Sequence, residues 1–182
     1  MNKLRKKNLD LLKKSGVYHE SMEHDACGVG LVASTDGKKS RKVVEYGIQA
    51  LKAVWHRGAI DADGKTGDGA GIHIEIPPDF FIEKIEATGH KHNDSEVCVG
   101  MLFLPRNNYS AQEECRSIVE SELTKSNFNI YGWRQVPVDP SVLGETAESN
   151  RPEITQVLFK HNIKEEKGKK LEIKLYEARR KI

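Results

Sequence analysis

Residues 97–104 read Val-Cys-Val-Gly-Met-Leu-Phe-Leu, one of the longest nearly apolar runs in this chain of 182 residues. A run of this length, rich in β-branched and large apolar side chains, predicts a buried strand. The next segment, residues 110–125, predicts a helix whose inward face carries Cys115, Ile118, Val119 and Leu123. Further strands are predicted at residues 129–136, 154–159 and 171–175.

The segments before this strand also predict a succession of strands, turns and helices. Residues 27–33 (Cys-Gly-Val-Gly-Leu-Val-Ala) predict a short strand, followed by a Thr-Asp-Gly turn at residues 35–37. The spacing of Val44, Ile48, Leu51 and Trp55 predicts a helix over residues 41–56. The glycine-rich residues 57–71 predict a loop, the alternating residues 72–76 a half-buried strand, and residues 79–87 a short helix. The three strands predicted in succession after the helix at residues 110–125 favour a layered α+β domain over a regular parallel βαβ fold.

The composition excludes several classes of protein. Apolar residues make up 37% and charged residues 31%, and the formal net charge is only +2, so nothing indicates binding to nucleic acid. The apolar runs are too short to cross a membrane, and the basic N-terminus lacks the apolar segment of a secretory signal. Three cysteines without a close pair argue against a disulfide scaffold and a zinc module. We therefore expect a cytoplasmic protein.

Two glycine patterns resemble nucleotide-binding motifs, but the neighbouring elements or the glycine spacing that such motifs require are missing. Gly28-x-Gly30-x-x-Ala33 matches the dinucleotide fingerprint, yet no strand is predicted before it and no helix after it. Gly64-Lys65-Thr66 ends like a phosphate-binding loop, but position 59, five residues earlier, is Ala59 instead of glycine. His90-Lys-His92 could offer two metal ligands, but without a third at a suitable spacing we expect solvated loop histidines.

Cys27 is the best candidate for a reactive residue. It begins an apolar strand, and Gly28 and Gly30 would let other backbone approach it closely. A single cysteine is more often a small buried apolar residue, which is the interpretation we give to Cys98 and Cys115. The residues alone leave both interpretations of Cys27 open.

Two blocks of sequence decide between these two interpretations of Cys27. The first is residues 27–33. The second, at residues 50–72, reads Ala-Leu-Lys-Ala-Val-Trp-His-Arg-Gly-Ala-Ile-Asp-Ala-Asp-Gly-Lys-Thr-Gly-Asp-Gly-Ala-Gly-Ile. They closely resemble the class II glutamine amidotransferase domain at the N-terminus of glutamate synthase large subunits. The resemblance continues through residues 99–105, 112–116, 131–137 and 151–153 and covers the chain from about Asp25. The His-Arg-Gly element is shared by several amidotransferases, whereas the longer run is specific to glutamate synthases.

The resemblance implies an N-terminal-nucleophile (Ntn) hydrolase fold, a four-layer αββα sandwich that would be incomplete at its C-terminal side. It also implies that residues 1–26 are a propeptide removed on maturation, and that residues 27–182 are the N-terminal part of the amidotransferase domain. The basic residues of the leader would then belong to the propeptide.

The same resemblance implies that Cys27 attacks L-glutamine, releasing ammonia and leaving a γ-glutamyl thioester. A freed α-amine, with a pKa of about 7.7–8.0, is a far better base at neutral pH than a lysine with a pKa of about 10.4. Arg57 and Gly58 belong to the His-Arg-Gly element and would support the site. For Arg57, a purely structural role in the loop stays open. We expect Asp61, Asp63 and Asp68 to form turns rather than to act as acids.

The chain contains no Asn-Gly pair, which supplies the oxyanion hole in this family, and nothing similar to its later arginine motif. We therefore expect this segment to be inactive alone, with FMN and an iron–sulfur cluster expected only in the full-length protein. The small subunit of glutamate synthase is a possible partner. The alternatives are a truncated, non-catalytic, partner-binding module, and an amidotransferase feeding a different acceptor, such as a phosphoribosyl or sugar substrate.

Overall fold

The computed structural model describes residues 7, 10, 11, 14, 28–54, 58, 60–92, 96–163 and 167–182. The chain divides into two compact units. The first comprises Met1–Ala59 and Asp68–Ile72, and the second comprises Ile60–Gly67 and His73–Ile182.

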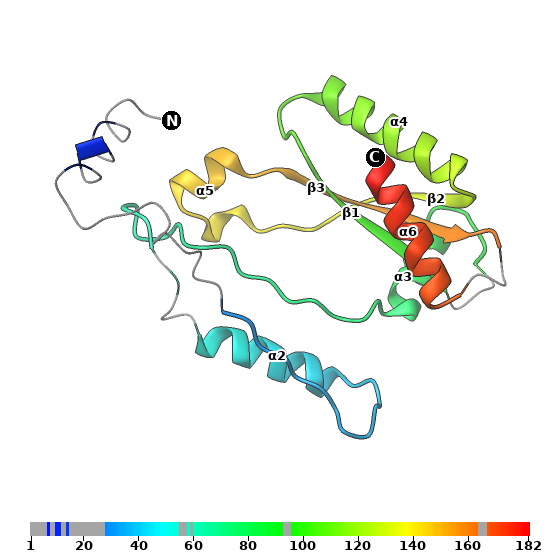
Figure 1. Cartoon of the computed structure of the whole chain (residues 1–182), viewed down its shortest axis with the longest axis horizontal. Helices are drawn as coiled ribbons and strands as arrows, with labels where there is room; N and C mark the ends of the chain where they lie inside the picture. Colours follow the sequence, from blue (N-terminus) through cyan, green and yellow to red (C-terminus); the bar gives the residue numbers. More distant parts are fainter. Residues whose placement is uncertain are drawn as a thin grey trace. The chain divides into compact units, whose positions relative to one another are not determined.

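The first unit contains helix α2, Arg41–Ala53 (Figure 1). The helix confirms the prediction over the described part of residues 41–56; Trp55 and His56 lie outside the described residues. The apolar positions Val44, Ile48 and Leu51 recur on one helical face and are half-buried. Lysine in the last turn, Lys52, complements the negative end of the helix dipole.

The predicted strand at residues 27–33 is wrong for its described part. Residues 28–34 have no regular secondary structure, and the side chains of Val29 and Leu31 are 96% and 92% exposed. A strand needs a neighbouring strand to accept its backbone hydrogen bonds, and none pairs with this segment among the described residues. The turn predicted after it is confirmed, with the N–H of Gly37 donating to the carbonyl of Ser34.

The second unit is built on a three-stranded antiparallel sheet in the order β1-β3-β2 (Figure 1). Its strands are β1 (Cys98–Leu104), β2 (Phe128–Gln135) and β3 (Glu153–His161). In the register of the sheet, Val157 of β3 lies opposite Gly100 of β1 and Trp133 of β2. The strands predicted at residues 97–104, 129–136 and 154–159 are therefore confirmed.

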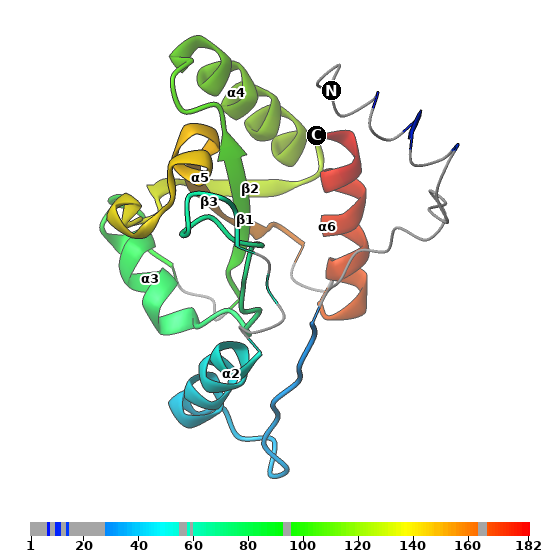
Figure 2. The same ribbon diagram turned by 90° about the vertical axis from the view of Figure 1, so that its left-hand side faces the viewer.

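Helices pack against both faces of this sheet, but Met101 and Phe103 of β1 stay 50% and 67% exposed. Val157 and Phe159 of β3 pack on one face against Val119 of α4 (Tyr109–Lys125) and Leu171 of α6 (Lys169–Lys181). Leu158, which points the other way, packs against Phe81 and Ile85 of α3 (Pro78–Glu86). Figure 2 shows α3 and α6 on opposite sides of the sheet. The observed architecture is α+β with an antiparallel sheet, in agreement with the predicted class.

The helices predicted at residues 79–87 and 110–125 are confirmed by α3 and α4. One side chain that was predicted to face inward on α4 is exposed. Val119 and Leu123 of α4 are buried and Cys115 is half-buried, but Ile118 is 44% exposed. The side chain of Asn108 caps α4 by accepting a hydrogen bond from the N–H of Ala111 at 3.0 Å.

Two other predicted strands are wrong. The segment at residues 171–175 lies in α6, because Leu171, Leu175 and Ala178 share one helical face that packs on the core. Residues 71–77 have no regular secondary structure, and Ile72, Ile74 and Ile76 are 40–46% exposed. No strand of the described residues pairs with them.

Two short elements connect β2 to β3. They are the 3₁₀ helix η3, Pro140–Val142, and helix α5, Glu145–Asn150. None of the helices that the structure describes is both long and apolar enough to cross a membrane.

Candidate active site

The predicted nucleophile, Cys27, lies outside the described residues, and so does Arg57. Gly58 is described and lies at an exposed bend. A side chain at Gly28 or Gly30 would meet no described atom within 4 Å, so the close backbone approach expected there is not present among the described residues. With Cys27 and Arg57 outside the described residues, the grouping of the three predicted site residues stays a prediction.

The loop that follows Arg57 is described from Ile60 and forms a tight turn. Ile60 and Gly67 make an isolated antiparallel bridge, and the N–H of Asp61 donates to the carbonyl of Thr66 at 2.7 Å. Gly64 adopts a φ of +68°, which L-residues with a side chain rarely adopt. The turn is therefore closed by its own backbone hydrogen bonds.

Asp63 organises this turn through its carboxylate. Its Oδ1 accepts hydrogen bonds from the backbone N–H groups of Lys65 at 2.9 Å and Thr66 at 2.7 Å, and its Oδ2 accepts one from the Thr66 hydroxyl at 2.5 Å. These bonds, the one from the Thr66 hydroxyl first, lower the pKa of Asp63 well below its usual range. The expectation that Asp63 forms a turn is confirmed. The N–H groups of Lys65 and Thr66, which a phosphate loop would offer to its ligand, donate to Asp63 instead.

The same turn lies against the start of α5. The backbone N–H of Ala147 donates to the Thr66 hydroxyl oxygen at 3.3 Å. A Cβ atom at Gly144 would overlap the Asp63 carboxylate and the Thr66 hydroxyl and backbone nitrogen, so glycine is needed there for the turn to approach this closely. Sequence reasoning missed this contact, because Thr66 and Ala147 are 81 positions apart.

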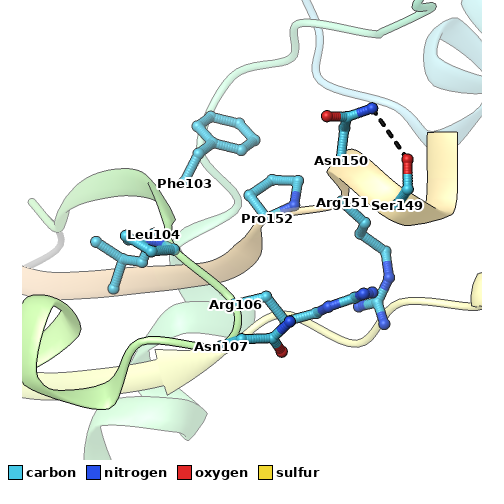
Figure 3. A pocket seen from close by; sticks show the side chains of 9 residues that line it. Phe103, Leu104, Arg106, Asn107, Ser149, Asn150, Arg151 and Pro152 are labelled. Carbon is cyan, nitrogen blue, oxygen red and sulfur yellow. Dashed lines mark hydrogen bonds between the residues drawn. The ribbon is translucent and has the colours of Figure 1, made fainter. Parts of the chain in front are cut away.

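A pocket with a cavity volume of about 390 Å³ lies beside the other end of α5. It is lined by residues 103–107 and 149–152, and Figure 3 shows the side chains of Arg106 and Arg151 ending near each other on one side of it. Gly58, the predicted site residue that the structure describes, is not among the residues that line this pocket.

The two arginines of the pocket share one carboxylate, that of Glu148 in α5. Arg151 donates from Nε to Glu148 Oε2 at 2.7 Å and from Nη2 to Oε1 at 3.2 Å, and Arg106 donates to Oε1. Arg151 first, and then Arg106, holds the pKa of Glu148 below its usual value. Sequence reasoning also missed this cluster; its only signal was that Arg151-Pro-Glu153 belongs to the resemblance described above.

The two described thiols differ in burial. Cys98 of β1 is buried, and burial, with the nearby charges of Glu96 and Glu172, raises the pKa of its thiol to about 12. Such a thiol stays protonated at neutral pH and is a poor nucleophile. Cys115 is half-buried on α4. The interpretation of Cys98 as a small buried apolar residue is confirmed.

The described residues include no group of three or more histidine, cysteine, aspartate and glutamate side chains that could hold a metal ion. His92 departs from the expectation of a solvated loop histidine: it is buried, and its Nδ1 lies 2.8 Å from the hydroxyl of Tyr131. The ring of Tyr131 covers it edge-on.

Comparison with known proteins assigns this chain to a family. The profile of the family Glutamine amidotransferases class-II matches residues 27–182. The large chain of glutamate synthase (NADPH) from Azospirillum brasilense is 51% identical over 175 residues, which are 96% of this chain and 12% of that protein. The ferredoxin-dependent glutamate synthase of Cyanidium caldarium is 41% identical over 161 residues, 88% of this chain and 10% of that protein. The glutamate synthase (NADH) of Saccharomyces cerevisiae is 38% identical over 151 residues, 80% of this chain and 7% of that protein. The chain thus spans about a tenth of the length of these relatives.

Proposed function

Since the chain belongs to the class-II glutamine amidotransferases, we propose that it is the glutamine-hydrolysing part of a glutamate synthase, with Cys27 as its nucleophile. Three observations support the proposal. The family match begins at Cys27, and the relatives named above are glutamate synthases. The raised pKa of the buried Cys98 thiol disfavours that cysteine as the nucleophile.

The chemistry follows from placing the thiol and a base on one residue. Removal of residues 1–26 frees the α-amine of Cys27, whose pKa of about 7.7–8.0 lets it accept the thiol proton near neutral pH. The thiolate attacks the side-chain amide carbon of glutamine, and the C–N bond then breaks as the amine returns the proton to the leaving ammonia. Water hydrolyses the resulting γ-glutamyl thioester to glutamate and restores the thiol.

Arg57 and Gly58 support this site in the proposal. A guanidinium beside the nucleophile would stabilise the thiolate, and a glycine next to the arginine leaves room for substrate. An oxyanion hole contributes about 100- to 1,000-fold in rate for each donor. We propose that residues outside these 182 provide it, together with the clamp for the glutamine carboxylate.

The fold we propose for the complete domain is the four-layer αββα sandwich of the Ntn hydrolases. Helices α4 and α6 cover one face of the described sheet. On the other face, Met101 and Phe103 of β1 are 50% and 67% exposed. A second sheet packed there would bury these side chains, as face-to-face sheets do in a sandwich.

The cysteines that the structure describes do not form the ligand set of an iron–sulfur cluster. An iron–sulfur cluster requires a set of cysteine ligands, and the described residues offer Cys98, which is buried and protonated, and Cys115 on a different element. We therefore propose that FMN and the iron–sulfur cluster bind elsewhere in the complete protein. A small subunit as partner and a cytoplasmic location belong to the same proposal.

The proposal is tested in the complete protein that carries this domain. Cys27→Ala should abolish glutamine-dependent glutamate formation and leave ammonia-dependent formation intact, since ammonia enters after the hydrolytic step. Cys115→Ala, the matched control, should leave both activities unchanged. Intact-mass measurement of the active protein should show that residues 1–26 are missing. Active enzyme that retains Met1, or glutamine hydrolysis by Cys27→Ala, would contradict the proposal.

A further inference from the structure

We infer that the pocket lined by residues 103–107 and 149–152 binds a small organic carboxylate: Arg106 and Arg151 bind its charged group, and its carbon chain lies against the apolar side of the pocket. All the residues of this site belong to the second unit. The inference does not depend on the proposed function, because none of the residues proposed for glutamine hydrolysis takes part in it.

The first step is the charge of the residues that line the pocket. They include two arginines and no aspartate or glutamate. Glu148, which pairs with both arginines, is not a lining residue. Glu153, which also attracts the Arg151 guanidinium, does not line the pocket either, and its carboxylate accepts a hydrogen bond from the Gln135 amide at 2.6 Å. The lining itself is therefore positive, which favours an anionic ligand.

The second step is that the two guanidinium groups keep donors to offer. Arg151 uses Nε and Nη2 for Glu148, and Arg106 uses Nη1. Among the described residues, no acceptor is bound by Nη1 of Arg151 or by Nε and Nη2 of Arg106. The planar fork of a guanidinium matches the two oxygens of a carboxylate. The two side chains are only 26% and 19% exposed, so water screens their charges less than at an open surface.

The third step is that the arginine side of the pocket is held in place without a ligand. Gln112 of α4, which is buried, donates to the carbonyl of Pro105 at 2.8 Å and to that of Arg106 at 3.2 Å. Glu148 then holds both guanidinium groups. A site that is ordered in advance loses less conformational entropy when its ligand binds.

The fourth step is the apolar side of the pocket and its size. Phe103, Leu104, Pro105 and Pro152 line the pocket, and Figure 3 shows the Phe103 ring on a different side from the ends of the arginine side chains. The cavity of about 390 Å³ falls in the range of small-molecule sites, about 300–1,000 Å³. A bare inorganic anion would leave the apolar side without a partner, whereas a carboxylate on a short carbon chain contacts both sides.

The second sheet that we propose above for the complete domain would cover Phe103. The inference therefore requires that the pocket stay open on the side of Arg106 and Arg151 in the complete protein. For this reason the test uses the complete protein rather than the 182 residues alone.

The test measures the binding of pentanoate by saturation-transfer NMR, with pentanamide as an uncharged probe of the same length. Pentanoate should bind saturably with a dissociation constant of about 1 mM, in keeping with its small size. Pentanamide should bind at least about 10-fold more weakly, because it cannot form charge-assisted hydrogen bonds with the arginines. Acetate, which lacks the carbon chain, and inorganic phosphate should both bind more weakly than pentanoate.

Variants then locate the site. Arg106→Gln and Arg151→Gln each remove one guanidinium and should weaken pentanoate binding about 10- to 100-fold. Arg106→Lys keeps a cation opposite Glu148 but loses the planar fork, so it should weaken binding less than Arg106→Gln does. The matched control is Arg116→Gln on α4. Arg116 is 27% exposed and pairs with Glu113, much as Arg106 pairs with Glu148, but it does not line the pocket, so this variant should bind pentanoate as the wild type does. Melting temperatures establish which variants are folded during the titration.

Three results with the wild type would each overturn the inference: no saturable binding of pentanoate, equal binding of pentanamide, or tighter binding of phosphate than of pentanoate. With the variants, it is overturned if folded Arg106→Gln and Arg151→Gln both bind pentanoate as well as the wild type, or if Arg116→Gln weakens binding as much as they do. Should Arg106→Gln and Arg151→Gln fail to fold, Arg106→Lys decides, and wild-type affinity in that variant overturns the inference.

Discussion

Cys98 shows how burial in the core makes a cysteine thiol unreactive. Its thiol is buried in the core formed by β1, α4 and α6, and burial raises its pKa from 9.0 to about 12. Because the folded pKa is raised, the stability contributed by the protonated thiol is complete below pH 9 and is lost as the pH rises toward 12. At pH 7–9 the folded protein therefore presents almost no Cys98 thiolate.

We predict that a glutamine-analogue electrophile at pH 7–9 labels Cys27 and leaves Cys98 unmodified. Peptide mapping by mass spectrometry measures both sites in one sample. Denaturant provides the control, since unfolding returns Cys98 to an ordinary pKa and should make it reactive. Labelling of Cys98 in the folded protein at a rate near that of Cys27 would show that the wrong thiol was chosen.

At the scale of elements, prediction from the sequence succeeded for the three strands that pair with one another and failed for the segment at residues 171–175. Strands β1, β2 and β3 pair with one another, and their apolar runs were predicted within one or two residues. The strand predicted at residues 171–175 was wrong. Leu171 and Leu175 fit one face of a helix as well as one face of a strand. Local periodicity cannot choose between them when the packing surface is far away in the sequence.

Cys27, Arg57 and Gly58 were predicted from two separate sequence blocks and stay predictions. That Asp63 forms a turn was predicted from its residue type and is confirmed. The contact between Thr66 and α5, and the sharing of Glu148 by two arginines, could not be predicted. Each joins segments more than 40 residues apart, and no local pattern encodes such a pairing.

Helix α5 provides a pH-dependent prediction. The pKa of Glu148 is lowered by Arg151 and Arg106, so its stabilising contribution is present above its unfolded pKa and is lost as the pH falls through the folded value. Glu148→Gln should therefore melt at a lower temperature than the wild type at pH 7, and the difference should shrink on going to pH 3.

Thermal melts of both proteins between pH 7 and pH 3 measure this effect. The control is Glu113→Gln on α4, whose carboxylate is 69% exposed and pairs with Arg116; an exposed pair contributes little, so its melting temperature should hardly change. A difference between wild type and Glu148→Gln that stays constant across this range would assign the stabilisation to shape rather than to charge.

At the scale of the whole molecule, the described residues leave much apolar surface and strand edge uncovered. The outer edges of β1 and β2 pair with no strand of the described part of the chain. The segments at residues 28–34 and 71–77 carry exposed valine, leucine and isoleucine side chains. Open strand edges and apolar patches of this kind favour association between molecules.

We therefore predict that residues 27–182, expressed alone, associate or pack loosely and release no measurable ammonia from glutamine. Analytical ultracentrifugation over a range of concentrations should show self-association, and a thermal melt should lack a sharp transition. The complete protein, assayed for ammonia release under the same conditions, is the control. If the isolated segment were a cooperatively melting monomer that hydrolysed glutamine near the rate of the complete protein, then the oxyanion hole and the carboxylate clamp would have to be formed by these residues. The proposal that both lie outside the 182 residues would then be wrong.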